Sequence, residues 1–279
     1  MKTFKDKVVV VTGVGSGIGR ALAKTLHAKG AKLALNDYNN TTLEETVKLI
    51  GGHSENIYTE TFDVSDRDKF YEFAKRVKQH FGKVDCIINN AGVALGSVST
   101  EDLSYKDFEW VFGINFWGMV YGTKAFLPII KEQSEGNITN ISSIFGIAGI
   151  GYQTAYCTTK FAIRGFTESL RMEMHKESPQ VSICSVHPGG IKTNIARDSK
   201  SPDGSDREVD DQLLEEIENA FITSPDEAAS TILSGILKRK ERILIGSDAK
   251  KADRTVRIFP TKYTDIFLKD SFIVPPLKD

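Results

Sequence analysis

The sequence predicts one doubly wound α/β domain with a central parallel sheet of about seven strands flanked by helices. Short runs rich in β-branched residues alternate with segments of helical periodicity from Val8 to about residue 246. This alternation implies right-handed crossovers and helices on both faces of one sheet. A chain of 279 residues could also hold two small domains, but the continuous alternation favours a single large one.

The first half of the predicted domain has the order β-α-β-α-β-α-β. The expected strands are 8–11, 32–36, 57–62 and 84–89, and the expected helices are 17–29, 41–50 and 66–80. In the second half we expect a long helix over 105–131, with Pro128 as a candidate kink. It is followed by strands 137–141, 181–186 and 242–245 and by helices 155–175 and 225–239. We therefore assign residues 1–246 to the domain.

Two segments depart from this alternation of strands and helices. Residues 195–222 are polar and acidic and are too long for an ordinary connection, so we expect a substrate lid, with disorder as the alternative. The tail, 247–279, mixes basic and apolar residues. It could cover a subunit interface, cover the substrate pocket or rest on a membrane surface, and we expect packing against this chain or another subunit.

Composition excludes several classes of function. Lys plus Arg number 36 and Asp plus Glu 37, so nothing indicates a nucleic-acid partner or an anionic membrane. No apolar run approaches the ~18 residues of a membrane span, and the start of the chain does not resemble a signal peptide. The three cysteines and five histidines have no metal-ligand spacing. We expect a cytoplasmic protein without a metal.

The first predicted strand runs into a glycine-rich turn, TGVGSGIGRALA, over residues 12–23. Its glycines, Gly13, Gly17 and Gly19, form a G-x-x-x-G-x-G pattern, and not the G-x-G-x-x-G dinucleotide pattern. The physical reason for glycine is the same in both, because the backbone can turn sharply and approach a pyrophosphate at a helix N-terminus. A tight turn without a ligand is the alternative. The number of glycines favours dinucleotide binding.

Asp37 follows the second predicted strand, eighteen residues beyond Gly19. A carboxylate there can accept a hydrogen bond from the ribose 2′-OH of NAD and would repel the 2′-phosphate of NADP. The loop residues Val14, Gly15 and Ser16 offer no cation for such a phosphate, and Arg20 lies inside the predicted helix. A plain turn after the strand is the alternative. The pattern favours NAD over NADP.

Tyr156 and Lys160 are four residues apart on a predicted helix and therefore share a face. A nearby ammonium favours the phenolate and lowers the pKa of the phenol, which improves it as an acid and base near neutral pH. Such a pair alone is common, so its meaning depends on the surrounding motifs.

Six motifs make the sequence similar to the short-chain dehydrogenase/reductase family, whose fold is of the Rossmann type. They are TGVGSGIG (12–19), NNAG (89–92), Asn115, ISS (141–143), YCTTK (156–160) and HPGGIKT (187–193). They stand in the family's order over roughly the first 246 residues. The thirteen-residue separation of Ser143 and Tyr156 also matches the family.

The resemblance implies catalytic roles for four residues. Tyr156 would exchange the substrate proton, and Ser143 would hydrogen-bond the substrate oxygen. Lys160 would lower the pKa of Tyr156 and hold the nicotinamide ribose, while Asn115 would anchor a water that connects Lys160 to solvent. In oxidation Tyr156 would take the hydroxyl proton while the hydride goes to the nicotinamide.

The resemblance also implies a cofactor site and a substrate site. The implied cofactor residues are Gly13, Ser16, Gly17, Ile18, Gly19, Asp37, Asp63, Val64, Asn90, Ala91, Gly92, Tyr156, Lys160, Pro188, Ile191 and Thr193. Asp63 would contact the adenine amine. His187 is interpreted as a packing residue. The expected substrate contacts are Ser143, Phe145, Ile150 and Tyr156, with Ala94, Leu95, Ile144 and Tyr152 nearby, and these apolar side chains favour a lipophilic alcohol or ketone.

Three functions remain open on the sequence alone. The first is an NAD-dependent dehydrogenase of secondary alcohols. The second is an NADPH-dependent carbonyl or 3-oxoacyl reductase. The third, ranked last because Asn115, Ser143, Tyr156 and Lys160 are all present, is a non-catalytic dinucleotide-binding sensor. The family resemblance further implies a homodimer or homotetramer that associates through the helices expected at 105–131 and 155–175.

Overall fold

The computed structural model describes residues 1–193, 195, 199 and 221–269. Almost all of the expected lid, 195–222, and the last ten residues of the tail therefore lie outside the described residues. The division of the chain at residue 246 stays a prediction.

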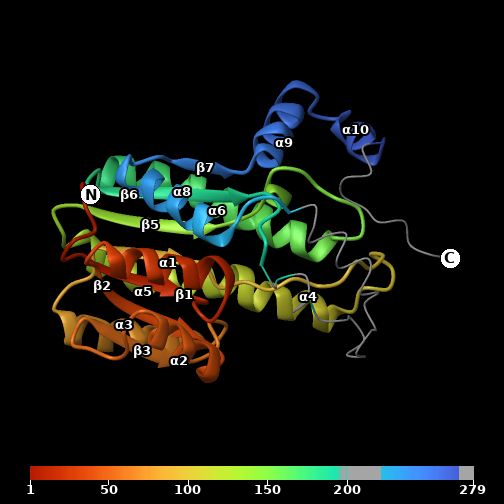
Figure 1. The fold of residues 1–279 in the computed structure, drawn as a ribbon. Coiled ribbons are helices and arrows are strands. Elements are labelled where there is room, and N and C mark those ends of the chain that lie inside the picture. The colour runs from red at the N-terminus through yellow and green to blue at the C-terminus, as the bar shows by residue number, and fades with distance from the viewer. Residues whose placement is uncertain (194, 196–198, 200–220, 270–279) are drawn as a thin grey trace.

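The described strands form one sheet of seven parallel strands in the order β3-β2-β1-β4-β5-β6-β7 (Figure 1). They are β1 (Val8–Thr12), β2 (Lys32–Asp37), β3 (Ile57–Thr61), β4 (Cys86–Asn89), β5 (Gly136–Ile141), β6 (Val181–Pro188) and β7 (Arg242–Ile245). The chain builds outward from β1 in one direction and then from β4 in the other. Ligands bind at such a reversal point, beyond the carboxyl ends of the strands. The predicted fold class is confirmed.

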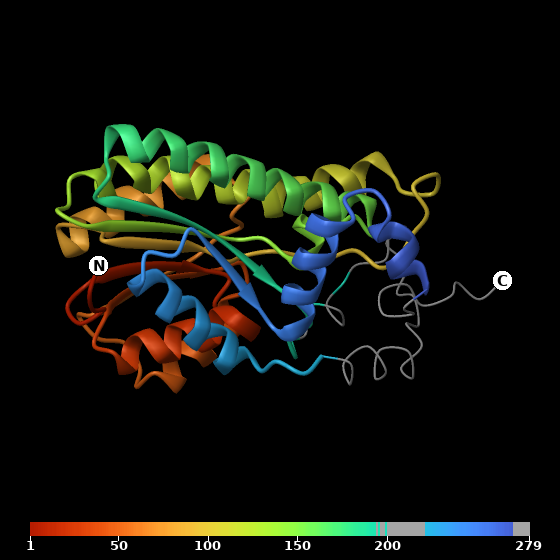
Figure 2. The ribbon, with the colours of Figure 1, turned by 90° about the horizontal axis from the view of Figure 1, so that it is seen from above.

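Helices cover both faces of the sheet, as Figure 2 shows. They are α1 (Gly17–Ala28), α2 (Asn40–Leu49), α3 (Arg67–Phe81), α4 (Tyr105–Phe112), α5 (Gly118–Lys131), α6 (Thr154–Glu177), α8 (Pro225–Leu237), α9 (Ser247–Ile258) and α10 (Tyr263–Lys269). On one face Leu22 of α1 and Ile232 of α8 share a core cluster. On the other, Phe70 of α3, Phe126 of α5 and Leu170 of α6 share a second. The strands are buried on both faces, which explains their continuous apolar runs.

Local signals set the ends of several helices. The Asp66 carboxylate accepts a hydrogen bond from the Lys69 N–H at 3.1 Å and caps α3, and Gly82 ends that helix with φ of 76°. The Ser224 hydroxyl accepts from the Glu227 N–H at 3.1 Å and Pro225 occupies the first turn of α8. These residues explain why the two helices begin close to the predicted positions.

The long helix expected over 105–131 is interrupted. A π-helical segment, Gly113–Trp117, joins α4 to α5 and contains the buried Asn115. A π-turn carries one more residue per turn than an α-helix and often occurs at functional sites. Apolar periodicity does not reveal such an insertion, because the segments on either side each keep a helical pattern. Pro128 lies inside α5, which continues to Lys131.

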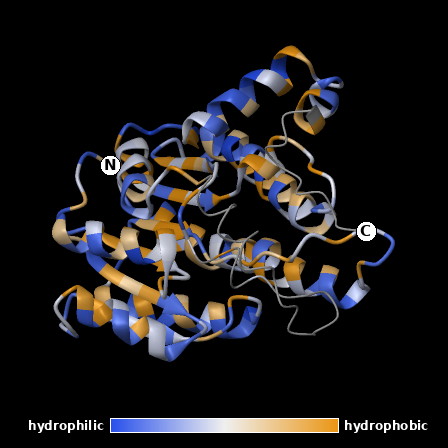
Figure 3. Ribbon diagram, turned by 45° about the vertical axis from the view of Figure 1, so that its right-hand side comes forward, coloured by the Kyte–Doolittle hydropathy of each residue, from blue (hydrophilic) through white to orange (hydrophobic). Residues whose placement is uncertain are grey.

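The described part of the tail forms α9 and α10, which the sequence had not predicted as helices. Ala249 and Ala252 of α9 are buried, and α9 lies beside β7. Tyr263 and Phe267 of α10 pack with Ile150 in a separate apolar cluster. Figure 3 shows both helices at one end of the molecule. In the portion of the chain that the structure describes, no helix is both long and apolar enough to cross a membrane.

Candidate active site

The glycine turn joins β1 to α1 at the reversal point of the sheet. Gly13 and Gly17 have φ of 67° and 51°, which side chains rarely adopt. A Cβ on Gly19 would lie 1.9 Å from the Gly13 carbonyl oxygen, so the turn closes only with glycine there. Ser16 precedes the helix but its side chain makes no capping hydrogen bond, and Ile18 packs on the core. The first N–H groups of α1 are thus not capped by Ser16 and suit an anion.

The NNAG segment after β4 packs directly against this turn. The Asn90 side chain donates to the carbonyl oxygens of Thr12 and Gly13 at 2.9 and 3.0 Å. The N–H groups of Asn90 and Ala91 donate to the Thr12 hydroxyl, both at 3.1 Å. A Cβ on Gly13 would lie 2.7 Å from Ala91 Cα. The two predicted cofactor segments therefore form one continuous surface.

Asp37 lies at the end of β2, beside the glycine turn, and is 7% exposed. Its carboxylate accepts from the Gly15 N–H at 2.7 Å and from the Asn39 N–H at 3.0 Å. Arg20 donates to the Gly15 carbonyl and pairs with Glu45 at 2.8 Å. The one cation of the turn is thus already neutralised by a carboxylate.

Asp63 and Val64 follow β3. The Asp63 carboxylate accepts from the N–H and the hydroxyl of Ser65 at 2.9 and 2.8 Å. Val64 is buried, and a Cβ on Gly118 would lie 2.7 Å from its methyl group. Val64 therefore packs under the start of α5, whereas Asp63 is the polar group of this loop.

The segment after β6 reaches the glycine turn from the other side. Pro188 ends β6, and the buried Ile191 forms an isolated bridge with Thr223. A Cβ on Gly17 would lie 3.0 Å from the Thr193 methyl group. The predicted cofactor residues at Gly17 and Thr193 therefore lie next to each other, although 176 residues separate them in the chain.

Two of the predicted catalytic residues, Lys160 and Asn115, meet at Gly92, and Tyr156 lies beside Lys160. Lys160 of α6 has its Nζ 5.3 Å from the centre of the Tyr156 ring. A Cβ on Gly92 would lie 3.4 Å from Lys160 Nζ and 3.2 Å from Asn115 Oδ1. The NNAG turn, the π-helical segment and α6 thus meet at one point.

Ser143 is the second residue after β5. Its Oγ accepts from the Phe145 N–H at 3.1 Å, which leaves the hydroxyl proton free to be donated. Burial raises the pKa of Tyr156, and a hydrogen bond with Ser143 opposes that rise. Ser142, its neighbour, instead donates to the Lys160 carbonyl oxygen at 2.8 Å. The structure therefore pairs Ser143, and not Ser142, with the phenol.

The Asn115 side chain holds the loop that follows NNAG. Its Oδ1 accepts from the Val93 N–H at 2.8 Å, and its Nδ2 donates to the Val93 carbonyl at 3.0 Å and to Thr159 Oγ1 at 3.3 Å. The amide thus orients Gly92 through its neighbour Val93. The expected role in anchoring a water stays a prediction.

Burial dominates the protonation of the phenol and the amine. It raises the pKa of Tyr156 to about 12, against the lowering by Ser143. Burial also lowers the pKa of Lys160 to about 8. Loss of water disfavours the charged form of each group. The expectation that Lys160 lowers the pKa of Tyr156 stays a prediction.

Replacing Lys160 by Met should change how stability depends on pH. Because the pKa of Lys160 is about 8 in the folded chain and ordinarily 10.5, the unfolded chain binds the extra proton between these values. Stability of the wild type should then rise with pH through this window. The Lys160→Met variant lacks the rise in stability that comes from the lowered pKa of Lys160. The difference between the wild-type Tm and the variant Tm should therefore increase from pH 8 to 10.5. Thermal unfolding in matched buffers measures it, and a constant difference would contradict the shift.

A small cavity of about 10 Å³, room for about one water molecule, adjoins Tyr156. Its lining includes Leu95 and Tyr152, which the sequence analysis had placed near the substrate, and Val98 and Leu103, which it had not. A larger hollow, of about 270 Å³, lies between Lys29 and α8 at the opposite edge of the sheet, and its lining contains none of the predicted site residues.

Phe145 and Ile150, the other expected substrate contacts, lie in the cluster with α10. Phe145 also meets the Tyr156 ring edge-on at 5.9 Å. The Tyr263 hydroxyl accepts from the Gly149 N–H at 3.2 Å and so ties α10 to this loop. Sequence reasoning missed Tyr263, since nothing local in the tail indicates which loop it contacts.

A phenol, an ammonium and a hydroxyl beside an anion-binding glycine turn define a class of protein: oxidoreductases that use a nicotinamide dinucleotide. The family model described as short chain dehydrogenase matches residues 7–204. SadH of Mycobacterium tuberculosis, a protein named as an oxidoreductase, is 41% identical over 263 residues, 94% of each chain. The chain belongs to the short-chain dehydrogenase/reductase family and is an enzyme acting on CH–OH groups.

Two solved structures are similar to all or most of the chain. A short-chain dehydrogenase/reductase from Burkholderia phymatum in complex with NAD has a TM-score of 0.82 and 27% identity, covering 100% of both chains. An alcohol dehydrogenase from the archaeon Thermococcus sibiricus, complexed with 5-hydroxy-NADP, has a TM-score of 0.70 and 27% identity, covering 86% of this chain and 96% of the other. The family thus binds a nicotinamide dinucleotide, in NAD or NADP form.

Proposed function

We propose that this enzyme interconverts a lipophilic secondary alcohol and its ketone, with NAD as the cofactor and Tyr156 as the acid and base. One observation carries the proposal: Lys160 Nζ and Asn115 Oδ1 both lie within 3.4 Å of the position of a Cβ on Gly92, and Tyr156 and Ser143 adjoin them. An amine, a phenol and a hydroxyl at the reversal point suit proton exchange with an alcohol.

The residues around the glycine turn fit a dinucleotide. The N-terminus of α1 would hold the pyrophosphate, Asp37 the adenosine ribose, and Thr193 would lie at the nicotinamide end. Asp63 and Asn90 would contact the adenosine half. The nicotinamide ring supplies the acceptor or donor of the hydride when bound.

The protein's own residues would handle the proton. In oxidation the Tyr156 oxygen takes the proton of the substrate hydroxyl, and in reduction it returns a proton to the substrate oxygen. The Ser143 hydroxyl donates to the same oxygen and stabilises charge on it. Lys160 as an ammonium stabilises the phenolate.

The apolar side chains beside Tyr156 support an apolar substrate. Leu95, Val98 and Leu103 contribute aliphatic side chains to the lining of the small cavity, and Val98 and Leu95 are at most 9% exposed. Apolar linings with a few converging polar groups are typical of small-molecule sites. The direct test is a panel of secondary alcohols and ketones, followed through NADH absorbance. Turnover only of charged or primary substrates would reject the proposed class.

The similarity to the 5-hydroxy-NADP complex favours a second candidate, an NADPH-dependent carbonyl or 3-oxoacyl reductase. We favour NAD because the Asp37 carboxylate faces the Gly15 N–H at 2.7 Å and the Arg20 charge is paired with Glu45. A 2′-phosphate would then meet a carboxylate without a free cation beside it.

Replacing Asp37 by Ser should relax the cofactor preference. The hydroxyl can still accept a hydrogen bond, but the repulsion of a 2′-phosphate disappears, so the NADPH-to-NADH ratio of kcat/KM should rise by about tenfold or more. Asp68→Ser, at an exposed position of α3, is the matched loss of a carboxylate and should leave the ratio unchanged. A wild type that already prefers NADPH would support the second candidate.

We also propose a cytoplasmic homodimer or homotetramer. Cys86, Cys157 and Cys184 are free and buried, as suits a reducing compartment. Trp117, at the end of the π-helical segment, and Phe161 of α6 are 47% and 38% exposed and offer apolar surface for association. Light scattering at micromolar concentration gives the state directly.

A further inference from the structure

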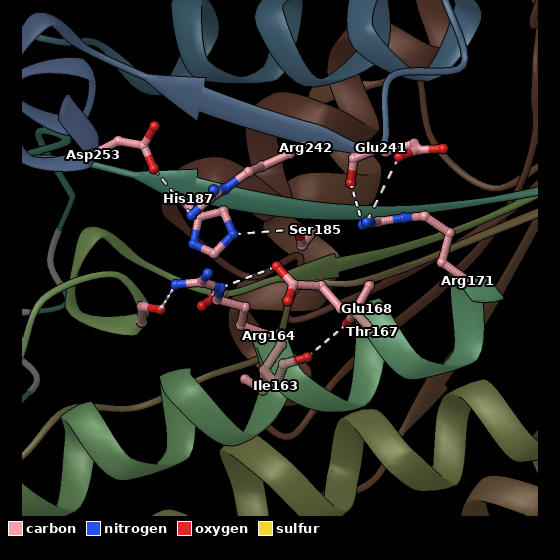
Figure 4. A network of polar contacts seen from close by, with 12 residues as sticks. Ile163, Arg164, Thr167, Glu168, Arg171, Ser185, His187, Glu241, Arg242 and Asp253 are labelled. Carbon is pink, nitrogen blue, oxygen red and sulfur yellow. Dashed lines mark hydrogen bonds and ion pairs between the residues drawn. The ribbon is translucent and has the colours of Figure 1, made fainter. Parts of the chain in front are cut away.

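His187 is buried directly behind the predicted catalytic serine. It is the penultimate residue of β6, and none of its surface is exposed. Its Nδ1 lies 3.0 Å from the Ser143 carbonyl oxygen, and its Nε2 lies 3.2 Å from Ser185 Oγ. Figure 4 shows the imidazole between Ser185 and the Arg242 side chain. Both ring nitrogens are thus within hydrogen-bonding distance of a polar atom.

The partners of the ring determine which nitrogen carries the proton. A carbonyl oxygen can only accept, so Nδ1 must donate to Ser143, and Nε2 then accepts from the Ser185 hydroxyl. Burial is the main cause that lowers the pKa of His187, and the hydrogen bond to the Ser143 carbonyl opposes it. The guanidiniums of Arg242 and Arg164 add to the lowering and Glu168 opposes them, so that the pKa lies at about 4. The ring is therefore neutral at pH 7, in the Nδ1–H form.

The charges around the ring are themselves balanced. Arg164 of α6 pairs with Glu168 at 3.0 Å, and Arg242 of β7 pairs with Asp253 of α9 at 3.1 Å (Figure 4). Neither carboxylate makes a hydrogen bond to His187 among those between described residues. The imidazole is therefore a neutral hydrogen-bond donor. The group that it holds is the Ser143 carbonyl.

Ser143 lies just beyond the end of the regular ladder. The last β5–β6 pair is Ile141 with Val186, and the Ser142 N–H still donates to the Val186 carbonyl at 2.8 Å. At the next residue, Ser143, the hydrogen bond comes from the His187 side chain and not from the backbone of β6. The Ser143 carbonyl receives the His187 N–H and also the Gly146 N–H at 2.9 Å. Both lone pairs of that oxygen are thereby occupied.

This bonding holds the backbone of Ser143 in place from two sides. Its Oγ accepts from the Phe145 N–H, which leaves the hydroxyl proton free to be donated. We propose that His187 is a positioning residue that orients Ser143 toward the substrate oxygen through the Ser143 carbonyl. This inference rests on the proposed function of Ser143, and it goes beyond the packing role first expected of His187.

The hydrogen bond can be tested without any substrate. In protein labelled with ¹⁵N-histidine, two-bond ¹H–¹⁵N correlations at pH 7 should show one neutral ring in the Nδ1–H form. That signal should be lost in His187→Asn, which assigns it among the five histidines. An Nε2–H or a doubly protonated ring at His187 would overturn the proposal, whether or not the alcohol activity is found.

The role can be tested on the best substrate of the alcohol and ketone panel. His187→Leu removes the donor and should lower kcat about tenfold, whereas His187→Asn, whose amide can donate, should recover most of it. The dissociation constant for NADH should not change. The apparent pKa in the kcat/KM profile should rise in His187→Leu, because Ser143 no longer stabilises the phenolate as well.

Thr167→Val is the matched control. Thr167 is equally buried, lies on α6 and bonds Ile163 and Asn140, so its loss should lower Tm without moving kcat or the pH profile. Equal losses of kcat in Thr167→Val and His187→Leu would reduce His187 to a structural residue and overturn the proposal. An unchanged kcat in His187→Leu would also overturn the proposal. A His187→Leu variant that loses only NADH binding would do the same.

Discussion

Replacing Tyr156 by Phe should lower kcat by about 10²–10⁴-fold while NADH binding stays within about twofold, because only the proton-exchanging oxygen is removed. The ring keeps its edge-on contact with Phe145 at 5.9 Å, so the wall of the cavity survives. Stopped-flow absorbance at saturating NAD gives kcat, and NADH fluorescence gives the dissociation constant.

Tyr105→Phe is the control for this change. Tyr105 is 89% exposed at the start of α4, and loss of its hydroxyl should leave both constants unchanged. Turnover retained in Tyr156→Phe would remove the phenol from the mechanism and leave Ser143 as the remaining hydroxyl near the substrate. Loss of NADH binding would instead indicate that Tyr156 mainly supports the cofactor.

Replacing Gly19 by Ala should weaken dinucleotide binding by about 100-fold or more, since displacing a binding group by about 1 Å has effects of this size. The new Cβ would lie 1.9 Å from the Gly13 carbonyl oxygen and 2.6 Å from Asn90 Nδ2. Because the Gly13 carbonyl is backbone, the turn itself must shift, and with it the N-terminus of α1. We also expect a lower Tm, since overpacking a buried site typically destabilises by about 1–3 kcal/mol.

Gly165→Ala is the matched substitution. A Cβ on Gly165 of α6 would meet no atom within 4 Å, and alanine in a helix restricts the unfolded chain, so Tm should rise slightly. Titration of NADH fluorescence and thermal unfolding separate the two effects. Normal NADH affinity in a folded Gly19→Ala protein would show that the turn does not bind the pyrophosphate.

Site features that depend on residues close together in the sequence could be predicted. The glycine turn, the NNAG segment and the pair Tyr156 and Lys160 each depend on local spacing, and parallel strands bring them to one edge of the sheet. These segments could be placed in one site because the strand order of a parallel sheet determines which strand ends are neighbours. The proximity of Gly17 and Thr193 was not predicted and appears only in the structure.

Features that depend on packing were not predictable in this way. The segment Gly113–Trp117 interrupts a helix without any break in its apolar pattern. Val98 and Leu103 reach the cavity through loops whose path depends on tertiary contacts. The sequence predicts only a packing role for His187. Its partners, Ser143 and Ser185, are known only when the register of β5 and β6 is known.

The π-helical turn also determines how this segment can change in length. Deleting Ile114 would return the turn to α-helical pitch, and the helices on either side would keep their phase, because the wider turn accommodates the extra residue. Val111 on one side and Phe126 on the other would then stay in their core clusters, but Asn115 would lose the position from which it bonds Val93. A single-codon deletion here should therefore leave a folded protein in which the loop after NNAG is no longer held.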